Sequence, residues 1–279
     1  MKREILDNMT RQKNSNGFNS NQKDINGLID RLTLFDDDLM SRVFDKNIEA
    51  TELVLRIILG RKIKVISVDG QDELKSHEIG GRNITLDVHA LVGNGEKIDI
   101  EIQGNPEGAN IRRARYHSSV VDSRMLREGQ NFKELRDSYV IFIYRHDKFR
   151  KGLPLYHIDR YISETKEVID DGSHIIYVNG NYRGQDEIVQ LMKDFHQTDP
   201  EKIYYDVLAQ GVKHFKETKE GCEVMSELVQ KYGDERAIEA YMISVKNLME
   251  NMKLTLEQAL NALGIQGDER RIITNKLQK

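Results

Sequence analysis

Residues 84–103, ITLDVHALVGNGEKIDIEIQ, form two runs in which apolar and polar side chains alternate, with a glycine-containing segment between them. This alternation is the period of a strand with one buried face, and two such runs around a short turn indicate a β-hairpin. The face opposite the apolar one carries three acids, Asp87 in the first run and Asp99 and Glu101 in the second. The chain must therefore fold around a strand pair whose polar face is acidic.

The apolar faces of the two strands must lie on the same side of the hairpin, and this requirement fixes the pairing register. A two-residue turn at 94–95 would place Asp87 opposite Ile102, on the wrong face. A three-residue loop at 93–95 makes the numbers of each facing pair sum to 188 and pairs Asp87 with Glu101. We therefore expect these two carboxylates to be cross-strand neighbours, with Cβ atoms roughly 4.5–5.5 Å apart.

Two carboxylates at this separation repel each other unless a positive charge lies between them. Mg²⁺ suits the arrangement, because it prefers oxygen and is commonly held by one or two carboxylates together with water and substrate phosphates. The alternative is a solvated polar face on which the acids bind nothing. The spacing alone leaves both possibilities open.

The elements around the hairpin predict an α/β layer structure with a mixed sheet. A helix precedes it, with Asp36, Asp37 and Asp38 where N-capping acids are expected. The other expected elements follow the order helix, three strands, helix, strands. They are a helix at 38–59, strands at 64–68, 84–92 and 98–103, a helix at 110–127, and strands at 139–144, 155–158 and 174–178.

Three regions are expected along the chain. Residues 1–27 are polar and lack apolar periodicity, which indicates a flexible tail. Residues 28–184 form the α/β core, and residues 185–279 form a helical C-terminal region, with a soft boundary near 184. These C-terminal helices either pack on the sheet or form a separate arm, and they are a candidate surface for homo-oligomerisation. Their expected positions are 185–195, 201–217, 219–231, 234–253, 255–263 and 267–277.

Bulk properties restrict location and partners. The single cysteine, Cys222, excludes an internal disulfide and favours a reducing compartment, so we expect a cytoplasmic protein. Neither a signal-peptide core nor a membrane-spanning segment is expected from the sequence. The formal net charge of −4 argues mildly against a high-affinity nucleic-acid binder, but it is compatible with a nuclease that has acidic ligands and a local basic patch.

Asp87 followed by Glu101-Ile102-Gln103 resembles the D…(D/E)xK signature of the PD-(D/E)XK nuclease superfamily, in an ExQ form. The segments NIEATELVLRIIL before the hairpin and RRARYHSS, YVIFIY and GLPLYHIDRYI after it are similar in order to the branch of PD-(D/E)XK nuclease family transposases, also called recombination-promoting nuclease (Rpn)-like proteins. The resemblance covers about residues 34–215. It implies a restriction-endonuclease-like αβββαβ core, followed here by the helical C-terminal region.

The resemblance also implies an activity, a Mg²⁺-dependent hydrolysis of DNA phosphodiesters in which Mn²⁺ can substitute. On this basis Asp87 and Glu101 would be metal ligands, and the backbone carbonyl of Ile102 would be a further one. Glu52, on the first helix, would reach the ion through a water molecule. Its alternative role is a surface ion pair.

Gln103 departs from the family signature, in which Lys supplies a positive charge near the attacking water. An amide can orient water but carries no charge. Either a neighbouring arginine compensates, or hydrolysis is slow or lost. The alternative function is accordingly a nuclease-fold module that binds nucleic acid or protein without cutting, and a third possibility gives the main role to the C-terminal helices as an oligomerisation or adaptor arm.

The helix after the hairpin supplies the candidate DNA contacts. Arg113 and Tyr116, together with Arg115, are expected to face DNA, because arginine suits bidentate contacts with phosphate. A merely solvated basic face is the alternative. His89 shares the polar face with Asp87 and is expected to be a hydrogen-bonded sheet histidine.

Overall fold

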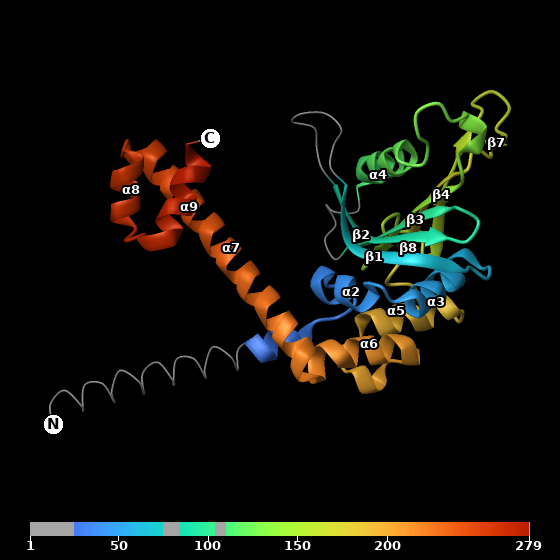
Figure 1. Ribbon diagram of the computed structural model, residues 1–279, viewed down its shortest axis with the longest axis horizontal. Coiled ribbons are helices and arrows are strands. Elements are labelled where there is room, and N and C mark those ends of the chain that lie inside the picture. The colour runs from blue at the N-terminus through green and yellow to red at the C-terminus, as the bar shows by residue number, and fades with distance from the viewer. Residues whose placement is uncertain (1–24, 75–83, 104–109, 279) are drawn as a thin grey trace. The chain divides into compact units, whose positions relative to one another are not determined.

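The computed structural model describes residues 25–74, 84–103 and 110–278 (Figure 1). These residues divide into two compact units. The larger unit is Asp30–Cys222, and the smaller comprises the chain from Glu223 onward with the described residues before Asp30. The boundary therefore falls near residue 222 rather than near 184.

A mixed sheet of six strands forms the middle of the larger unit, in the order β1-β2-β3-β4-β8-β5. β3, β4 and β8 are mutually parallel, and the remaining neighbours are antiparallel. The strand bounds are β1 Val65–Leu74, β2 Ile84–Val92, β3 Lys97–Gln103, β4 Ser138–Tyr144, β5 Leu155–Ile158 and β8 Ser173–Asn179. The predicted α/β class with a mixed sheet is confirmed. A short ribbon of β6 (Arg160–Tyr161) and β7 (Val168–Ile169) was not expected.

The hairpin of β2 and β3 has the predicted register. Facing pairs run from Leu91 with Lys97 to Val88 with Ile100, and the numbers of each pair sum to 188. The loop is the expected three-residue one, closed by the bond from the Gly95 N–H to the Val92 carbonyl at 2.9 Å. Gly95 has φ of 88°, a conformation that a side chain would strain.

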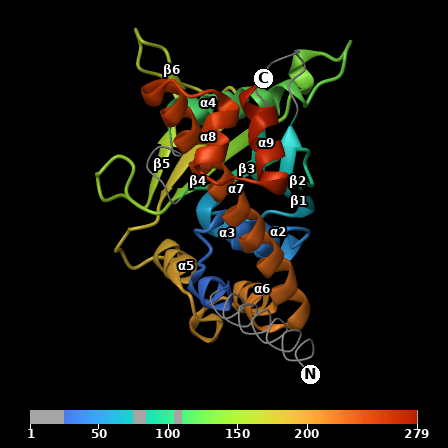
Figure 2. The same ribbon diagram turned by 90° about the vertical axis from the view of Figure 1, so that its left-hand side faces the viewer.

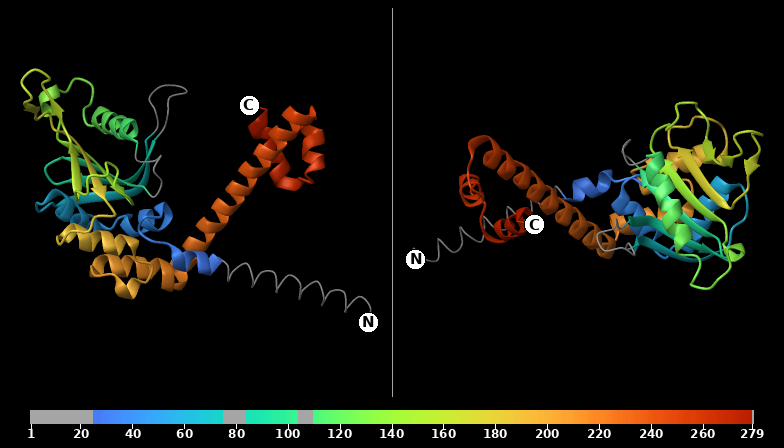
Figure 3. Two further views of the ribbon diagram at one scale, coloured as in Figure 1. Left: turned by 180° about the vertical axis from the view of Figure 1, so that it is seen from behind. Right: turned by 90° about the horizontal axis from the view of Figure 1, so that it is seen from above.

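Helices cover both faces of the sheet (Figures 1 and 3). α4, Ile111–Ser123, lies on one face, and α2, α3, α5 and α6 lie on the other. Their bounds are α2 Asp37–Phe44, α3 Ile48–Leu59, α5 Glu187–His196 and α6 Asp206–Glu217, and short 3₁₀ turns occur at Phe132–Glu134 and Pro200–Lys202. The apolar face of β3, Ile98, Ile100 and Ile102, is fully buried. The acids of β3 alternate with these residues and therefore point to the other face of the sheet, which α4 covers.

The helix expected at 38–59 is two helices, because Asn47 interrupts it. The Asn47 side chain accepts a hydrogen bond from the Ala50 N–H at 3.1 Å and donates one to the Val43 carbonyl at 3.0 Å. It thus begins α3 while holding the end of α2, and the intervening Lys46 has φ of 57°. Asparagine competes for backbone groups in this way, which is why it favours helix ends.

We expect Asn47→Ala to lower the free energy of unfolding by about 1–2 kcal/mol, because both side-chain bonds are lost. Asn47→Asp keeps the acceptor for Ala50 and should lose less. Urea unfolding measures both variants. Equal losses in the two variants would contradict the capping role.

α5 and α6 belong to the larger unit because their apolar residues pack beneath the sheet. Ile188, Leu191, Met192 and Phe195 of α5, and Leu208 and Val212 of α6, are buried. The helices expected at 219–231 and 234–253 are one helix, α7, Lys219–Met252. The C-terminal residues are helical, as expected.

The smaller unit has its own apolar core. The later part of α7 packs with α8, Leu256–Ala262, and α9, Gly267–Leu277 (Figure 2). The buried residues of this core are Val245, Ala259, Leu260, Ile265 and Ile273. Within the described ranges, no helix has the length and apolar character needed to cross a bilayer. Oligomerisation through this unit stays a prediction.

Candidate active site

Asp87 and Glu101 lie beside each other on the α4 side of the hairpin. The Asp87 N–H donates a hydrogen bond to Glu101 Oε1 at 3.3 Å, and the Ile102 N–H donates one to Asp87 Oδ2 at 2.9 Å. Glu101 is fully buried, whereas Asp87 is half-buried. The two acids predicted to converge are thus within hydrogen-bonding reach of each other's strands, and Asp87 is the one that meets solvent.

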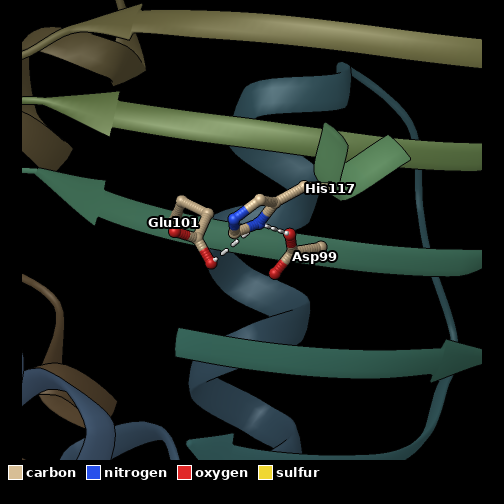
Figure 4. A group of neighbouring side chains, drawn as sticks. All are labelled: Asp99, Glu101 and His117. Carbon is tan, nitrogen blue, oxygen red and sulfur yellow. Dashed lines mark hydrogen bonds and ion pairs between the residues drawn. The ribbon is translucent and has the colours of Figure 1, made fainter. Parts of the chain in front are cut away.

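Two side chains of α4 contact the acids of β3. Arg113 Nη2 lies 2.5 Å from Glu101 Oε2. His117 Nδ1 lies 3.0 Å from Asp99 Oδ2 and 3.4 Å from Glu101 Oε1 (Figure 4). The Arg113 Nε–H also donates to His117 Nε2 at 3.3 Å. That bond requires an unprotonated Nε2, so it cannot form when the imidazole carries a proton on both nitrogens.

The connection between the parallel strands β3 and β4 places these side chains over the acids. Asn110 caps α4 by accepting a hydrogen bond from the Arg112 N–H at 2.8 Å. Ala114 is fully buried against the sheet, and a residue this small allows the helix to approach closely. Arg113 and His117 are four residues apart, so both project from one side of the helix.

A fourth acid approaches from α2. Burial, Asp38 and Glu101 raise the pKa of Asp37 to about 6, against an opposing effect of Arg113. Asp37 in turn contributes to the raised pKa of Asp87. The first turn of α2 therefore adds negative charge beside the two strand acids.

The pKa values of Asp87, Asp99 and His117 are shifted because several negative charges are buried together at this site. Burial first, and then Glu101 and Asp37, raise the pKa of Asp87 well above its usual value. Burial and Glu101 raise the pKa of Asp99 to about 7, although His117 opposes the shift. Burial alone would lower the pKa of His117, but its hydrogen bonds to Asp99 and Glu101 raise it to about 9.

Comparison with known protein families gives a match. A model described as PD-(D/E)XK nuclease family transposase matches residues 45–184. The chain belongs to the PD-(D/E)XK nuclease family transposases. Comparison with curated proteins and with solved structures gives no significant match. The family match confirms the resemblance seen in the sequence and makes this a nuclease-fold protein.

The structure of this PD-(D/E)XK family member does not bring Glu52 to the acids. Glu52 Oε1 accepts a hydrogen bond from the Val65 N–H at 2.8 Å, and Val65 pairs with Val92. Val92 is five residues along β2 from Asp87, which corresponds to roughly 16 Å. Glu52 therefore anchors the start of β1, and Asp37 is the helix acid whose charge acts on Asp87.

The other predicted residues are placed as follows. Gln103 ends β3 opposite Tyr144, and its side chain lies outside the described residues. Arg115 and Tyr116 are exposed on α4, whereas Arg113 is largely engaged by Glu101. His89 lies opposite Asp99 on the same face, as expected.

Sequence reasoning did not place Asp37, Asp99 or His117 in the site. Asp99 was recognised on the acidic face, but its partner was not. His117 follows Ala114 by one turn, so it lies on the packing face of α4, and that face must cover the acids of β3. A histidine on that face was the available signal. Asp37 was interpreted, with Asp36 and Asp38, as a helix-capping acid; it lies in the first turn of α2, and the N-cap residue Asp36 makes no side-chain capping bond.

The donor set suits a divalent cation. PD-(D/E)XK nucleases generally use divalent metal ions. Here Asp87 and Glu101 supply carboxylate oxygens, and in a neighbouring group Asp99, Glu101 and His117 have ligand atoms within 4.8 Å of one another. Asp99 Oδ1 is buried without a hydrogen-bond partner among the described residues. The negative charge gathered here is what a bound cation would offset.

Proposed function

We propose that this protein is a Mg²⁺-dependent DNA endonuclease of the transposase-associated, recombination-promoting type. The convergence of Asp87 and Glu101 carries the proposal. The two residues match, by sequence resemblance, the acidic positions of the D…(D/E)xK signature, come from adjacent antiparallel strands, and lie where the half-buried Asp87 opens to solvent. Family membership supports nuclease chemistry, and the acid pair supports the dependence on metal.

Asp87 and Glu101 are the residues that would hold the cation, with the Ile102 carbonyl as a further candidate and Asp37 within reach as an outer acid. When bound, the cation would lower the pKa of a coordinated water and offset charge on the phosphate. The Ile102 N–H fixes the Asp87 carboxylate, since Asp87 Oδ2 accepts its hydrogen bond. The protein thereby prepares the orientation of one ligand before any cation arrives.

Arg113 offers the positive charge that Gln103 lacks. Its guanidinium lies against Glu101, and its side chain is still 35% exposed. A guanidinium at this position can pair with a phosphate oxygen while remaining next to the acids. We propose that α4, rather than the end of β3, supplies the cationic side chain of the site.

Removal of divalent metal tests the function directly. We expect the purified protein to nick or linearise supercoiled plasmid DNA in Mg²⁺, and we expect excess EDTA to abolish the cleavage. Added Mg²⁺ or Mn²⁺ should restore it. Gel electrophoresis of the plasmid follows the reaction. Cleavage that continues in EDTA would overturn the proposal.

Arg115 and Tyr116 provide the DNA-contact part of the proposal. Both are exposed on the helix that carries Arg113. We expect Arg115→Gln to weaken DNA binding uniformly across sequences and to reduce the slope of log K against log [salt] by about 1. Fluorescence anisotropy at several salt concentrations measures both quantities. Lys133→Gln, an exposed residue outside α4, serves as the control and should leave the slope unchanged.

A binding module without turnover is the second candidate, and Gln103 favours it. In that case Mg²⁺ would raise the thermal stability of the protein, because ligation of the native state shifts unfolding, yet plasmid would stay intact. Thermal unfolding and plasmid cleavage on the same sample separate the two functions.

A further inference from the structure

Asp99, Glu101 and His117 form a cluster that differs in chemistry from the pair Asp87 and Glu101. Two carboxylates and one imidazole converge from β3 and α4 (Figure 4). The side chains of Asp99 and Glu101 have no exposed surface, and that of His117 is 3% exposed. Neither the family signature nor the proposed Mg²⁺ site assigns a role to Asp99 or His117.

The distances suit donors on a common ion. First-row divalent ions hold nitrogen and oxygen donors at roughly 2.0–2.2 Å, so adjacent donors on one ion lie roughly 3–3.5 Å apart. His117 Nδ1 lies 3.0 Å from Asp99 Oδ2 and 3.4 Å from Glu101 Oε1. Both distances from the imidazole therefore lie close to the separations that such coordination requires, and the two carboxylate oxygens lie within 4.8 Å of each other.

The second carboxylate oxygen of Asp99 provides an observation that is independent of these distances. Asp99 Oδ1 is buried and has no hydrogen-bond partner within the described part of the chain. A buried acceptor without a donor is costly, because its hydration is lost without replacement. A cation at the cluster would remove this cost. The ion pair between Asp99 and His117 alone does not.

We propose that Asp99, Glu101 and His117 form a second cation site, selective for a first-row transition ion such as Mn²⁺ over Mg²⁺. The imidazole determines the selectivity, since histidine suits transition ions, whereas Mg²⁺ takes oxygen donors and retains water. This inference rests on the proposed function in one respect, because Glu101 is shared with the Mg²⁺ site.

Loading this site has a consequence for Arg113. Coordination uses the Nδ1 lone pair, so the single ring proton of the neutral imidazole must move from Nδ1 to Nε2, and Nε2 then cannot accept from Arg113. Arg113 must then lose its contact with His117, and its side chain, which is already partly exposed, can turn toward solvent. The second cation thus releases the guanidinium that we assign to phosphate binding.

Titration with the two metals tests the site. We expect wild-type protein to bind two equivalents of Mn²⁺, measured by electron paramagnetic resonance of the free ion, and one equivalent of Mg²⁺ by calorimetry. His117→Ala and the isosteric Asp99→Asn should each lose one Mn²⁺ equivalent and keep Mg²⁺ binding. His157→Ala, which removes an exposed histidine on β5, is the control and should bind as wild type.

The variants also separate this inference from the proposed function. Asp87→Asn should lose the Mg²⁺ equivalent and DNA cleavage while keeping one Mn²⁺ at the second site. Full Mn²⁺ stoichiometry in both His117→Ala and Asp99→Asn would overturn the second site and leave the nuclease proposal intact. Circular dichroism establishes that each variant is folded. If His117→Ala does not fold, the milder variant Asp99→Asn still tests the site.

Discussion

Replacing Glu101 with Gln is expected to lower DNA cleavage by at least about a thousandfold. A cation held by these carboxylates would stabilise the charge of the transition state by several kcal/mol. Each 1.4 kcal/mol corresponds to a factor of ten in rate. Glu101 is also the acid that meets Asp87, Arg113 and His117 together. Its loss therefore disturbs every part of the proposed site. Single-turnover cleavage of plasmid in saturating Mg²⁺ measures the change.

Glu96 provides a matched control for this variant. It is a third buried acid of the same hairpin, besides Asp99 and Glu101, and it pairs with Arg61 at 2.6 Å, away from the cluster. We expect Glu96→Gln to retain cleavage close to wild type, even if it lowers stability. Asp87→Asn should behave as Glu101→Gln does. Cleavage preserved in both Asp87→Asn and Glu101→Gln would show that the reaction takes place elsewhere.

Replacing Lys216 with Met is expected to lower the free energy of unfolding of the larger unit by about 2–4 kcal/mol. Lys216 Nζ donates to three backbone carbonyls, those of Asp30 at 2.9 Å, Leu32 at 2.6 Å and Thr198 at 2.6 Å. Met keeps the apolar stem but leaves these acceptors without their shared donor. The ammonium joins α6 to segments far apart in the sequence.

Lys213 lies one turn earlier on α6 and serves as the control. It is exposed and pairs with Glu201 and Glu217 at the surface. Exposed pairs contribute roughly 0–1 kcal/mol, so Lys213→Met should change stability little. Urea unfolding followed by circular dichroism compares the two variants. A loss as large for Lys213→Met as for Lys216→Met would refute the role assigned to the buried ammonium.

The strand pattern allowed prediction of the sheet side of the site. Alternation and the requirement for a common apolar face fixed the register of β2 and β3, and the register determined that Asp87 and Glu101 are neighbours. These are local relations across a three-residue loop. They depend on side-chain direction, which a period of two specifies without knowledge of the rest of the fold.

The helical side of the site was harder to predict, because it depends on how the helices cross the sheet. His117 meets Asp99 only because α4 packs closely at Ala114, and a helical pattern identifies a packing face without its exact register on the sheet. Asp37 begins α2, which is separated from α3 by the break at Asn47. The family resemblance favoured Glu52 of α3 instead, and the hydrogen bond to Val65 uses that carboxylate elsewhere.

Arg113 connects the two parts of the site. In the structure it contacts both Glu101 and His117, so it balances part of the negative charge of the strand acids. A cation bound by the same acids would compete with it. This competition is the physical basis for our proposal that Arg113 of α4 supplies the positive charge that Gln103 lacks.

Anomalous diffraction from crystals soaked in Mn²⁺ tests the central claim most directly. We expect a peak roughly 2.0–2.2 Å from carboxylate oxygens of both Asp87 and Glu101. Asp87→Asn crystals treated in the same way should lose that peak. Diffraction without density between the two acids, at a Mn²⁺ concentration that supports DNA cleavage, would contradict the assignment of a metal-dependent nuclease site to this hairpin.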